Sequence, residues 1–128
     1  MDWAPLIAAA AAARAYSYSP FSHFAVGAAV QSADGAIFAG TNVENRSYGL
    51  ALCAERAAVA AAVAAGHRDF RAALVLTAST PPAPPCGLCR ETLAEFCGPD
   101  LPILLANLQG DRRQVLLGEI FPDPFVLR

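Results

Sequence analysis

The sequence predicts an α/β protein, a three-layer α/β/α sandwich built around a five-stranded mixed sheet. Segments with the alanine content and stop signals of helices alternate with short apolar runs typical of strands. The last two of these runs are joined only by residues 109–111. A connection of three residues joins antiparallel strands, because a parallel crossover takes a dozen residues or more. The fourth and fifth strands are therefore expected to be antiparallel neighbours.

The boundaries of the expected elements each have a local reason. Residues 16–20 end the first, alanine-rich helix, because proline disfavours a helical conformation in the residue before it. An Asp34-Gly35 pair between two apolar runs predicts a hairpin, and Gly66 predicts the end of the second helix. The expected elements are a helix at 2–15, strands at 24–32 and 36–43, a loop at 44–52, a helix at 53–65, a strand at 70–78, a proline-rich loop at 79–85, a helix at 86–97, strands at 101–108 and 112–117, and a helical turn at 118–121.

The composition indicates one domain, residues 1–128, that associates with copies of itself. Hydrophobic residues make up 55% of the chain and many are alanine, so flat apolar faces remain after a core has formed. The net charge is -2, and the basic residues are scattered arginines. A nucleic-acid partner is not expected, because polynucleotide binding needs a clustered basic surface.

The cysteines and the N-terminal segment predict a cytoplasmic protein with no membrane partner. Residues 1–3 lack the basic region of a secretory signal, and the apolar run at 6–13 is too short to span a bilayer. In a reducing compartment, a C-x-x-C pair indicates a metal or redox site rather than a disulfide.

Three cysteines form a candidate metal site. Cys53, Cys86 and Cys89 all lie at predicted helix starts, where the helix N-terminus favours the thiolate that binds metal. Structural zinc sites take four protein ligands, whereas catalytic sites take three and leave one position to water. The sequence therefore predicts one Zn²⁺ per chain in an open site that activates water.

Other interpretations of these side chains remain. Cys86 and Cys89 alone also fit a redox pair or a structural zinc knuckle. Cys97 is a possible fourth ligand, but it follows Cys89 by eight positions, about 12 Å along a helix, and is interpreted as a buried apolar residue. His23 and His67 are interpreted as ordinary polar residues.

Charged residues beside the cysteines complete this candidate site. Glu55 follows Cys53 by two positions and is predicted to carry protons between water and substrate, although a carboxylate there also suits a helix N-terminus. Three thiolates and Zn²⁺ leave one negative charge, which opposes ionisation of water. Arg56 and Arg90 are expected to offset that charge by hydrogen bonding to sulfur from a second layer of residues.

Four ordered motifs resemble the cytidine deaminase family, in particular its small homotetrameric three-cysteine branch. They are SPFSHFAVGAA at 19–29, GTNVEN at 40–45, CAER at 53–56 and PCGLCR at 85–90. The likeness extends from Tyr18 to Phe125. It implies zinc-dependent hydrolysis of cytidine and deoxycytidine to uridine and deoxyuridine, with release of ammonia, as in pyrimidine salvage.

The resemblance also implies roles for residues outside the metal site. Asn42 and Glu44 match the ribose-binding pair of the family, and their i, i+2 spacing at a strand end points both side chains the same way. A polar loop alone would also explain them.

Phe24 matches the aromatic that packs on the pyrimidine, although a core position is the commoner use of phenylalanine. Phe125 matches an aromatic that reaches a neighbouring subunit's pocket, and backbone groups of Ala54 and of the 45–48 loop would complete recognition. The implied assembly is a homotetramer with shared active sites.

Three positions depart from the family pattern. Phe21 stands where the family usually has Tyr, and Glu91 stands where it usually has Gln. Arg46 replaces a small residue in the loop that approaches an adjacent subunit's substrate. These departures bear on the substrate rather than on the reaction.

Three other functions are compatible with some of these motifs. A blasticidin-type deaminase would share the zinc site, but residues 42–45 favour a nucleoside. A polynucleotide deaminase would separate its last two strands with a helix. A non-enzymatic zinc module would not need Glu55 and would prefer a fourth protein ligand.

Overall fold

The structure is a computed structural model that describes residues 1–127. Its five strands form one sheet in the order β2-β1-β3-β4-β5. None of the helices in the described part is long and apolar enough to cross a membrane. The elements are α1 (Ala4–Arg14), β1 (Gly27–Ser32), β2 (Ile37–Thr41), η1 (Tyr48–Leu50), α2 (Ala54–Ala64), β3 (Phe70–Thr77), α3 (Gly87–Phe96), β4 (Pro102–Asn107), β5 (Arg112–Leu116) and α4 (Leu117–Ile120).

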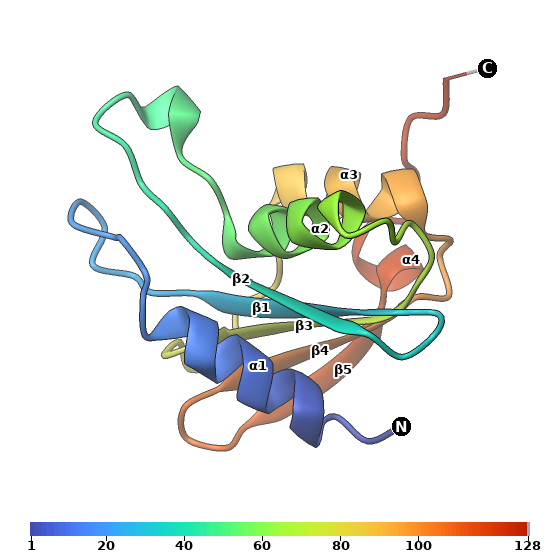
Figure 1. The fold of residues 1–128 in the computed structure, drawn as a ribbon, viewed down its shortest axis with the longest axis horizontal. Coiled ribbons are helices and arrows are strands. Elements are labelled where there is room, and N and C mark those ends of the chain that lie inside the picture. Colours follow the sequence, from blue (N-terminus) through green and yellow to red (C-terminus); the bar gives the residue numbers. More distant parts are fainter. Residues whose placement is uncertain (128) are drawn as a thin grey trace.

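The predicted three-layer architecture and mixed sheet are confirmed. Helix α1 covers one face of the sheet, and α2, α3 and α4 lie over the other (Figure 1). Strands β3 and β4 are parallel, while the other neighbouring pairs are antiparallel. The predicted antiparallel pairing of β4 and β5 is among them, with Ile103 opposite Val115.

Alternate strand residues divide between two hydrophobic cores, one on each side of the sheet. In β3, Leu74 and Leu76 pack towards α1, whereas Ala73 and Val75 pack towards α2 and α3. This alternation is the period of two that a strand imposes on its side chains. The segments 70–78 and 101–108 are therefore mostly apolar, because both faces of β3 and β4 are covered by helices.

Two glycines let the helices approach the sheet closely. A Cβ at Gly27 would stand 2.1 Å from the carbonyl oxygen of Ala10 in α1. A Cβ at Gly40 would stand 2.5 Å from the backbone nitrogen of Ala58 in α2. Real Cβ atoms do not come so close to backbone atoms, so both helices depend on these positions having no side chain. The same Cβ at Gly40 would stand 2.6 Å from the Ala54 carbonyl oxygen, so this close approach also positions the start of α2, next to Cys53.

The first strand begins three residues later than predicted, at Gly27 instead of Phe24. The reason is a side chain that takes the place of a neighbouring strand. The Asn42 carboxamide donates from Nδ2 to the Phe24 carbonyl and accepts at Oδ1 from the Val26 backbone N–H. The Phe24 carbonyl and the Val26 N–H are thus satisfied by a side chain and not by a neighbouring strand, and Phe24 and Val26 line the cavity described below.

Candidate active site

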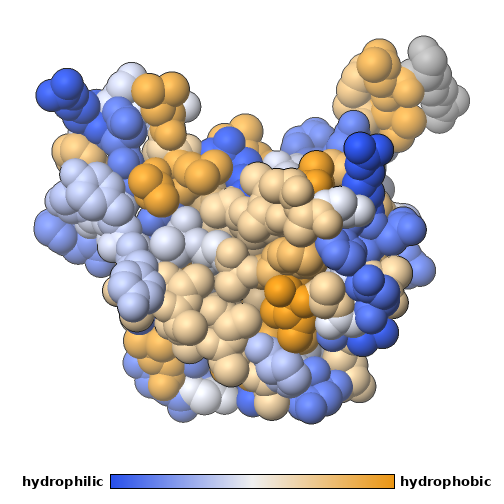
Figure 2. Space-filling model, viewed as in Figure 1, coloured by the Kyte–Doolittle hydropathy of each residue, from blue (hydrophilic) through white to orange (hydrophobic). Residues whose placement is uncertain are grey.

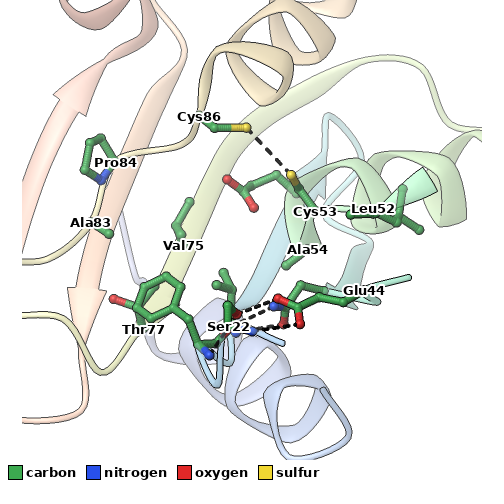
Figure 3. Close-up of a pocket in the computed structure, with 15 residues that line it drawn as sticks. Ser22, Glu44, Leu52, Cys53, Ala54, Val75, Thr77, Ala83, Pro84 and Cys86 are labelled. Carbon is green, nitrogen blue, oxygen red and sulfur yellow. Dashed lines mark hydrogen bonds between the residues drawn. The ribbon is translucent and has the colours of Figure 1, made fainter. Parts of the chain in front are cut away.

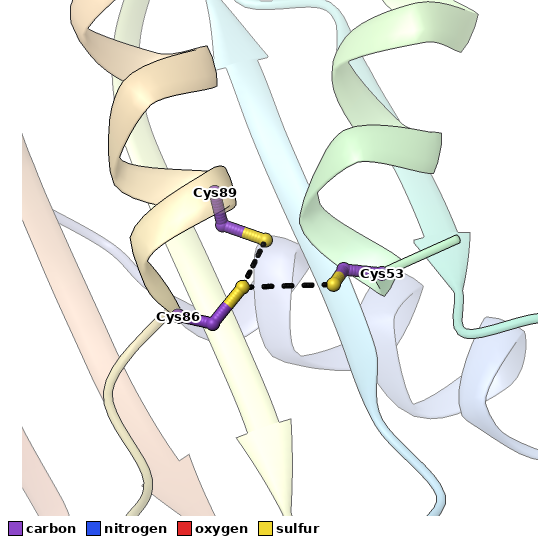
Figure 4. A group of neighbouring side chains, drawn as sticks. All are labelled: Cys53, Cys86 and Cys89. Atoms are coloured by element: carbon purple, nitrogen blue, oxygen red, sulfur yellow. Dashed lines mark hydrogen bonds between the residues drawn. The ribbon is translucent and has the colours of Figure 1, made fainter. Parts of the chain in front are cut away.

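Two helix starts bring the three predicted cysteines together. Cys53 is the N-cap of α2, Cys86 is the N-cap of α3, and Cys89 lies in the first turn of α3. Their sulfur atoms all lie within 4.8 Å of one another (Figure 4). The Cys53 and Cys86 sulfurs are 3.6 Å apart, and those of Cys86 and Cys89 are 3.4 Å apart.

This geometry fits a tetrahedral metal ion and not a disulfide. Sulfurs bound at about 2.3 Å around a tetrahedral zinc lie about 3.8 Å from one another, whereas bonded sulfurs lie about 2.05 Å apart. All four cysteines are free thiols. Cys97 lies outside the group, at the C-cap of α3, where it packs against the core. It is partly buried, where the sequence predicted a buried residue, and burial raises the pKa of its thiol to about 11.

The thiols of Cys53 and Cys89 differ in pKa. Hydrogen bonding to Cys89 and then to Cys86, together with the positive charge of the nearby Arg56, lowers the pKa of Cys53 to about 5. The same hydrogen bond to Cys53, followed by burial, raises the pKa of Cys89 above its usual range. One thiolate is thus stabilised by its neighbours' protons, a role that a divalent cation fills for all three sulfurs when it displaces those protons.

The two predicted arginines lie beside the cluster but bond differently from the expectation. Arg56 donates from Nη2 to the Ala51 carbonyl, and its buried Nε is a donor without a hydrogen-bond partner among the described residues. This unused donor next to Cys53 is consistent with a metal site, because metal-bound thiolates are strong acceptors. Arg90 donates to the carbonyl oxygens of Pro85 and Ile120 instead of to sulfur. It holds the backbone before Cys86, and its expected bond to a thiolate is not formed.

A cavity of about 290 Å³ opens beside the cysteines. Glu55, Phe24, Asn42, Glu44 and Ala54 all line it, together with Cys53 and Cys86. The close-up places the two labelled cysteines at one end and Ser22 with Glu44 at the other (Figure 3). The remaining lining residues, which the sequence did not single out, are Ser22, Val26, Ala51, Leu52, Val75, Thr77, Ala83 and Pro84.

Glu55 lies in the first turn of α2 with only 7% of its surface exposed. Burial raises the pKa of its carboxyl above the usual value. A buried carboxylate beside a metal site and open to a cavity is placed to exchange protons with whatever occupies that cavity.

The two residues of the predicted sugar-binding pair reach the same cavity from the segment that follows β2. Asn42 Oδ1 accepts from Val26 N and from the Ser17 hydroxyl, so its oxygen is fully used, while one Nδ2 proton remains after the bond to Phe24. Glu44 accepts from the backbone N–H groups of Phe21 and Ser22 and from the Ser22 hydroxyl. The Ser22 hydroxyl, followed by these N–H groups, lowers the pKa of Glu44. Sequence reasoning missed Ser22, although it stands inside the motif at 19–29.

The remaining predicted residues lie away from the cavity. Phe125 is 81% exposed in the extended segment after α4. Phe21 packs edge-on against Tyr48, with ring centroids 5.9 Å apart, and Arg46 is exposed in the loop before η1. Glu91 is exposed on α3, and His67 lies 3.7 Å from Asp34, at the other end of β1.

Comparison with known proteins gives one consistent answer. The family model described as the cytidine and deoxycytidylate deaminase zinc-binding region matches residues 2–105. A cytidine deaminase of Halalkalibacterium halodurans is 45% identical over 125 residues, covering 98% of this chain and 95% of that protein. One of Mycobacterium tuberculosis is 42% identical, covering 99% and 92%.

A solved structure is similar to this chain in both fold and sequence. The crystal structure of cytidine deaminase from Burkholderia pseudomallei is similar with a TM-score of 0.93 and 47% identity, covering 98% of this chain and 100% of that one. The open three-cysteine group, the buried carboxylate beside it, the sheet order and these likenesses agree, and the chain belongs to the cytidine and deoxycytidylate deaminase family of zinc-dependent hydrolases.

Proposed function

We propose that this protein hydrolyses cytidine and deoxycytidine to uridine and deoxyuridine, releasing ammonia, and so acts in pyrimidine salvage. The observation that carries the proposal is one cavity with a zinc-type thiol cluster and a buried carboxylate at one end and a polar pair at the other. The relatives named cytidine deaminases cover almost the whole chain, which supports the same activity here.

Cys53, Cys86 and Cys89 would hold one Zn²⁺ per chain. When bound, zinc acts as a Lewis acid that makes water acidic enough to serve as a nucleophile near neutral pH. Arg56 stabilises the excess negative charge of the three thiolates through its unused Nε donor. Arg90 keeps Cys86 in place through the Pro85 carbonyl.

Glu55 is the proposed proton carrier. It takes a proton from the attacking water and gives it to the ring N3, and it later takes the proton of the new C4 hydroxyl and passes it to the departing amine. The C4–O bond forms, the C4–N bond breaks, and the products are the C4 carbonyl and ammonia. The raised pKa that burial gives Glu55 suits this exchange, because a carrier must both accept and release protons near the working pH.

Asn42 and Glu44 are proposed to bind one sugar hydroxyl together. Asn42 has a single Nδ2 proton to offer, and Glu44 offers only acceptor oxygens. A group that satisfies both must accept one hydrogen bond and donate another, which a hydroxyl does. Phe24 would pack on the pyrimidine, and backbone groups of Ala54 would bond to its polar edge.

The charges of the cavity favour a nucleoside over a nucleotide. Among the residues that the structure describes, its lining includes the carboxylates of Glu44 and Glu55 and no arginine or histidine side chain. A phosphate group would approach this cavity against like charge and without a cationic partner. The proposed substrates are therefore the free nucleosides.

A cytoplasmic homotetramer with shared active sites is the proposed form of the protein. Phe125 and Tyr48 are 81% and 77% exposed, more than large apolar side chains usually are in a monomer. Figure 2 shows weakly apolar residues across the middle of one face, over α1, β2 and α2. In the tetramer, Phe125 would close a neighbour's pocket, and Arg46 would lie near a neighbour's substrate.

An ultraviolet assay with cytidine, deoxycytidine, cytosine and cytidine monophosphate tests these proposals side by side. We expect turnover of the two nucleosides and little turnover of cytosine or of the nucleotide. No ammonia from either nucleoside would contradict the proposed activity. Sedimentation at the assay concentration tests the assembly, and an active monomer would contradict shared active sites.

A further inference from the structure

The Ser22 hydroxyl lies between the carboxylate of Glu44 and the backbone of Phe24. Ser22 Oγ is 2.5 Å from Glu44 Oε2 and 3.0 Å from the Phe24 backbone nitrogen. Figure 3 shows Ser22 and Glu44 joined by hydrogen bonds at the end of the cavity away from Cys53. Twenty-two positions separate the two residues, so this contact is made by the fold and not by local sequence.

The direction of both hydrogen bonds is fixed by the partners. An ionised carboxylate only accepts, and a backbone N–H only donates. The single proton of the Ser22 hydroxyl therefore goes to Glu44, while one of its lone pairs accepts from Phe24. The hydroxyl keeps no proton for a ligand, so it cannot donate to the substrate, and its two hydrogen bonds are made to Glu44 and Phe24.

Ser22 determines where the second oxygen of Glu44 lies. Glu44 Oε1 is held by the backbone N–H groups of Phe21 and Ser22, at 3.0 and 3.2 Å. Among the described residues, Oε2 has the Ser22 hydroxyl as its hydrogen-bond donor. Without that hydroxyl, the carboxylate could turn about Oε1, because Glu44 is only partly buried.

The same hydroxyl also fixes the backbone that carries the Phe24 ring. The Phe24 N–H is held by Ser22 and its carbonyl is held by Asn42. His23, which lies between Ser22 and Phe24 in the sequence, has a φ of 57°, in the left-handed region, so the chain reverses sharply there. One hydroxyl thus sets the relative position of the aromatic wall and the acidic end of the cavity.

We infer that Ser22 is a positioning residue for nucleoside binding, which acts chiefly by orienting Glu44 and secondarily supports the backbone of Phe24. The inference rests on the proposed function, because Glu44 is the proposed sugar ligand. It concerns binding, since Ser22 lies at the end of the cavity away from the reacting groups.

Kinetics of Ser22→Ala and Ser22→Thr with cytidine test this inference. Ser22→Ala should raise KM about tenfold, as expected for a lost hydrogen bond to a charged group, and leave kcat within about twofold. Ser22→Thr keeps the hydroxyl, and its extra methyl has room at this exposed position, so its KM should stay within about twofold of the wild type. A KM for Ser22→Ala that matches the wild type would overturn the inference.

The chain supplies a matched control in Ser32→Ala. Ser32 donates to the Asp34 carboxylate and accepts from the Ala36 N–H, the same arrangement at the opposite end of β1. Ser32→Ala should leave KM and kcat unchanged even if it lowers the melting temperature. An equal rise of KM in both variants would show a general loss of structure and overturn the positioning role.

A double-mutant cycle separates action through Glu44 from a direct effect. If Ser22 orients Glu44, adding Ser22→Ala to Glu44→Ala should raise KM by less than twofold more. Effects that multiply would show independent action and overturn the inference. A wild type that releases no ammonia from cytidine would instead contradict the proposed function itself, and the inference with it.

Discussion

A Cβ atom added to Gly40 would stand 2.6 Å from the carbonyl oxygen of Ala54. Gly40 belongs to β2 and Ala54 begins α2, directly after Cys53 and before Glu55. The missing side chain at one strand position therefore sets how deeply the first turn of this helix, with its thiol and its carboxylate, sits against the sheet.

Gly40→Ala should destabilise the protein and weaken zinc retention. Overpacking of this kind costs about 1–3 kcal/mol, and here the displaced element carries a metal ligand. Urea unfolding and zinc content after dialysis measure the two effects. Gly49→Ala is the matched control, since a Cβ at Gly49 meets nothing within 4 Å. Equal stability of the two variants would show that α2 adjusts freely.

Removal of zinc should change the number of reactive thiols from one to four. In the zinc-loaded protein only Cys97 is outside the cluster, and it should react slowly because burial raises its pKa to about 11. A chelator should make three further thiols available to a chromogenic disulfide reagent, and Cys53, whose pKa is lowered to about 5, should react before the buried Cys89, whose pKa is raised. Three or four fast thiols before chelation would rule out a three-cysteine zinc site.

Glu55→Gln should keep zinc and lose almost all turnover. The amide preserves shape but cannot accept the proton, and loss of a positioned acid–base group lowers kcat by about 10²–10⁴-fold. Zinc analysis and kcat with cytidine are the measurements. Glu95→Gln, on the exposed side of α3, is the matched control and should leave kcat unchanged. Near-normal kcat in Glu55→Gln would remove Glu55 from the proposed role.

Asp34→Asn should lower stability in a way that depends on pH. The Ser32 hydroxyl, followed by the Ala36 N–H, lowers the pKa of Asp34. A carboxyl with a lowered folded pKa stabilises the protein above the unfolded value of about 3.9, and this contribution disappears as the pH falls through the folded pKa. Urea unfolding should therefore show a difference between wild type and variant at pH 7 and at pH 5, and a smaller difference below about pH 4.

The Ser32→Ala background provides the internal control for that prediction. Without the Ser32 hydroxyl, the pKa of Asp34 lies nearer its ordinary value, so Asp34→Asn should cost less there at pH 7. A difference that does not vary with pH would mean that the carboxylate charge is not what stabilises the turn.

The sequence predicted the elements well because each carries its own local signal. The Asp34-Gly35 pair and the short 109–111 link determine strand pairing without reference to distant residues. The start of β1 was misplaced at Phe24 because the backbone there bonds to the Asn42 side chain, and no local pattern reveals such a contact.

In the candidate site, too, the features with a local sequence signal were predicted and the contacts between distant segments were not. The spacing of the cysteines placed the metal cluster, since it follows from two helix starts. The Ser22–Glu44 bond and the carbonyl partners of Arg90 were missed, because they join segments whose meeting depends on the folded sheet. The expected role of Phe125 remains a prediction, since it concerns a neighbouring subunit.

The cavity is built from two parts of the chain that are fastened separately. The end that carries the metal ligands is formed by the starts of α2 and α3. The polar end is formed by the segment 18–26, which is hydrogen-bonded to Asn42 and Glu44. Substrate range and chemical step can therefore be engineered independently. Libraries confined to residues 18–26 should alter which nucleosides are accepted while the hydrolytic machinery stays intact.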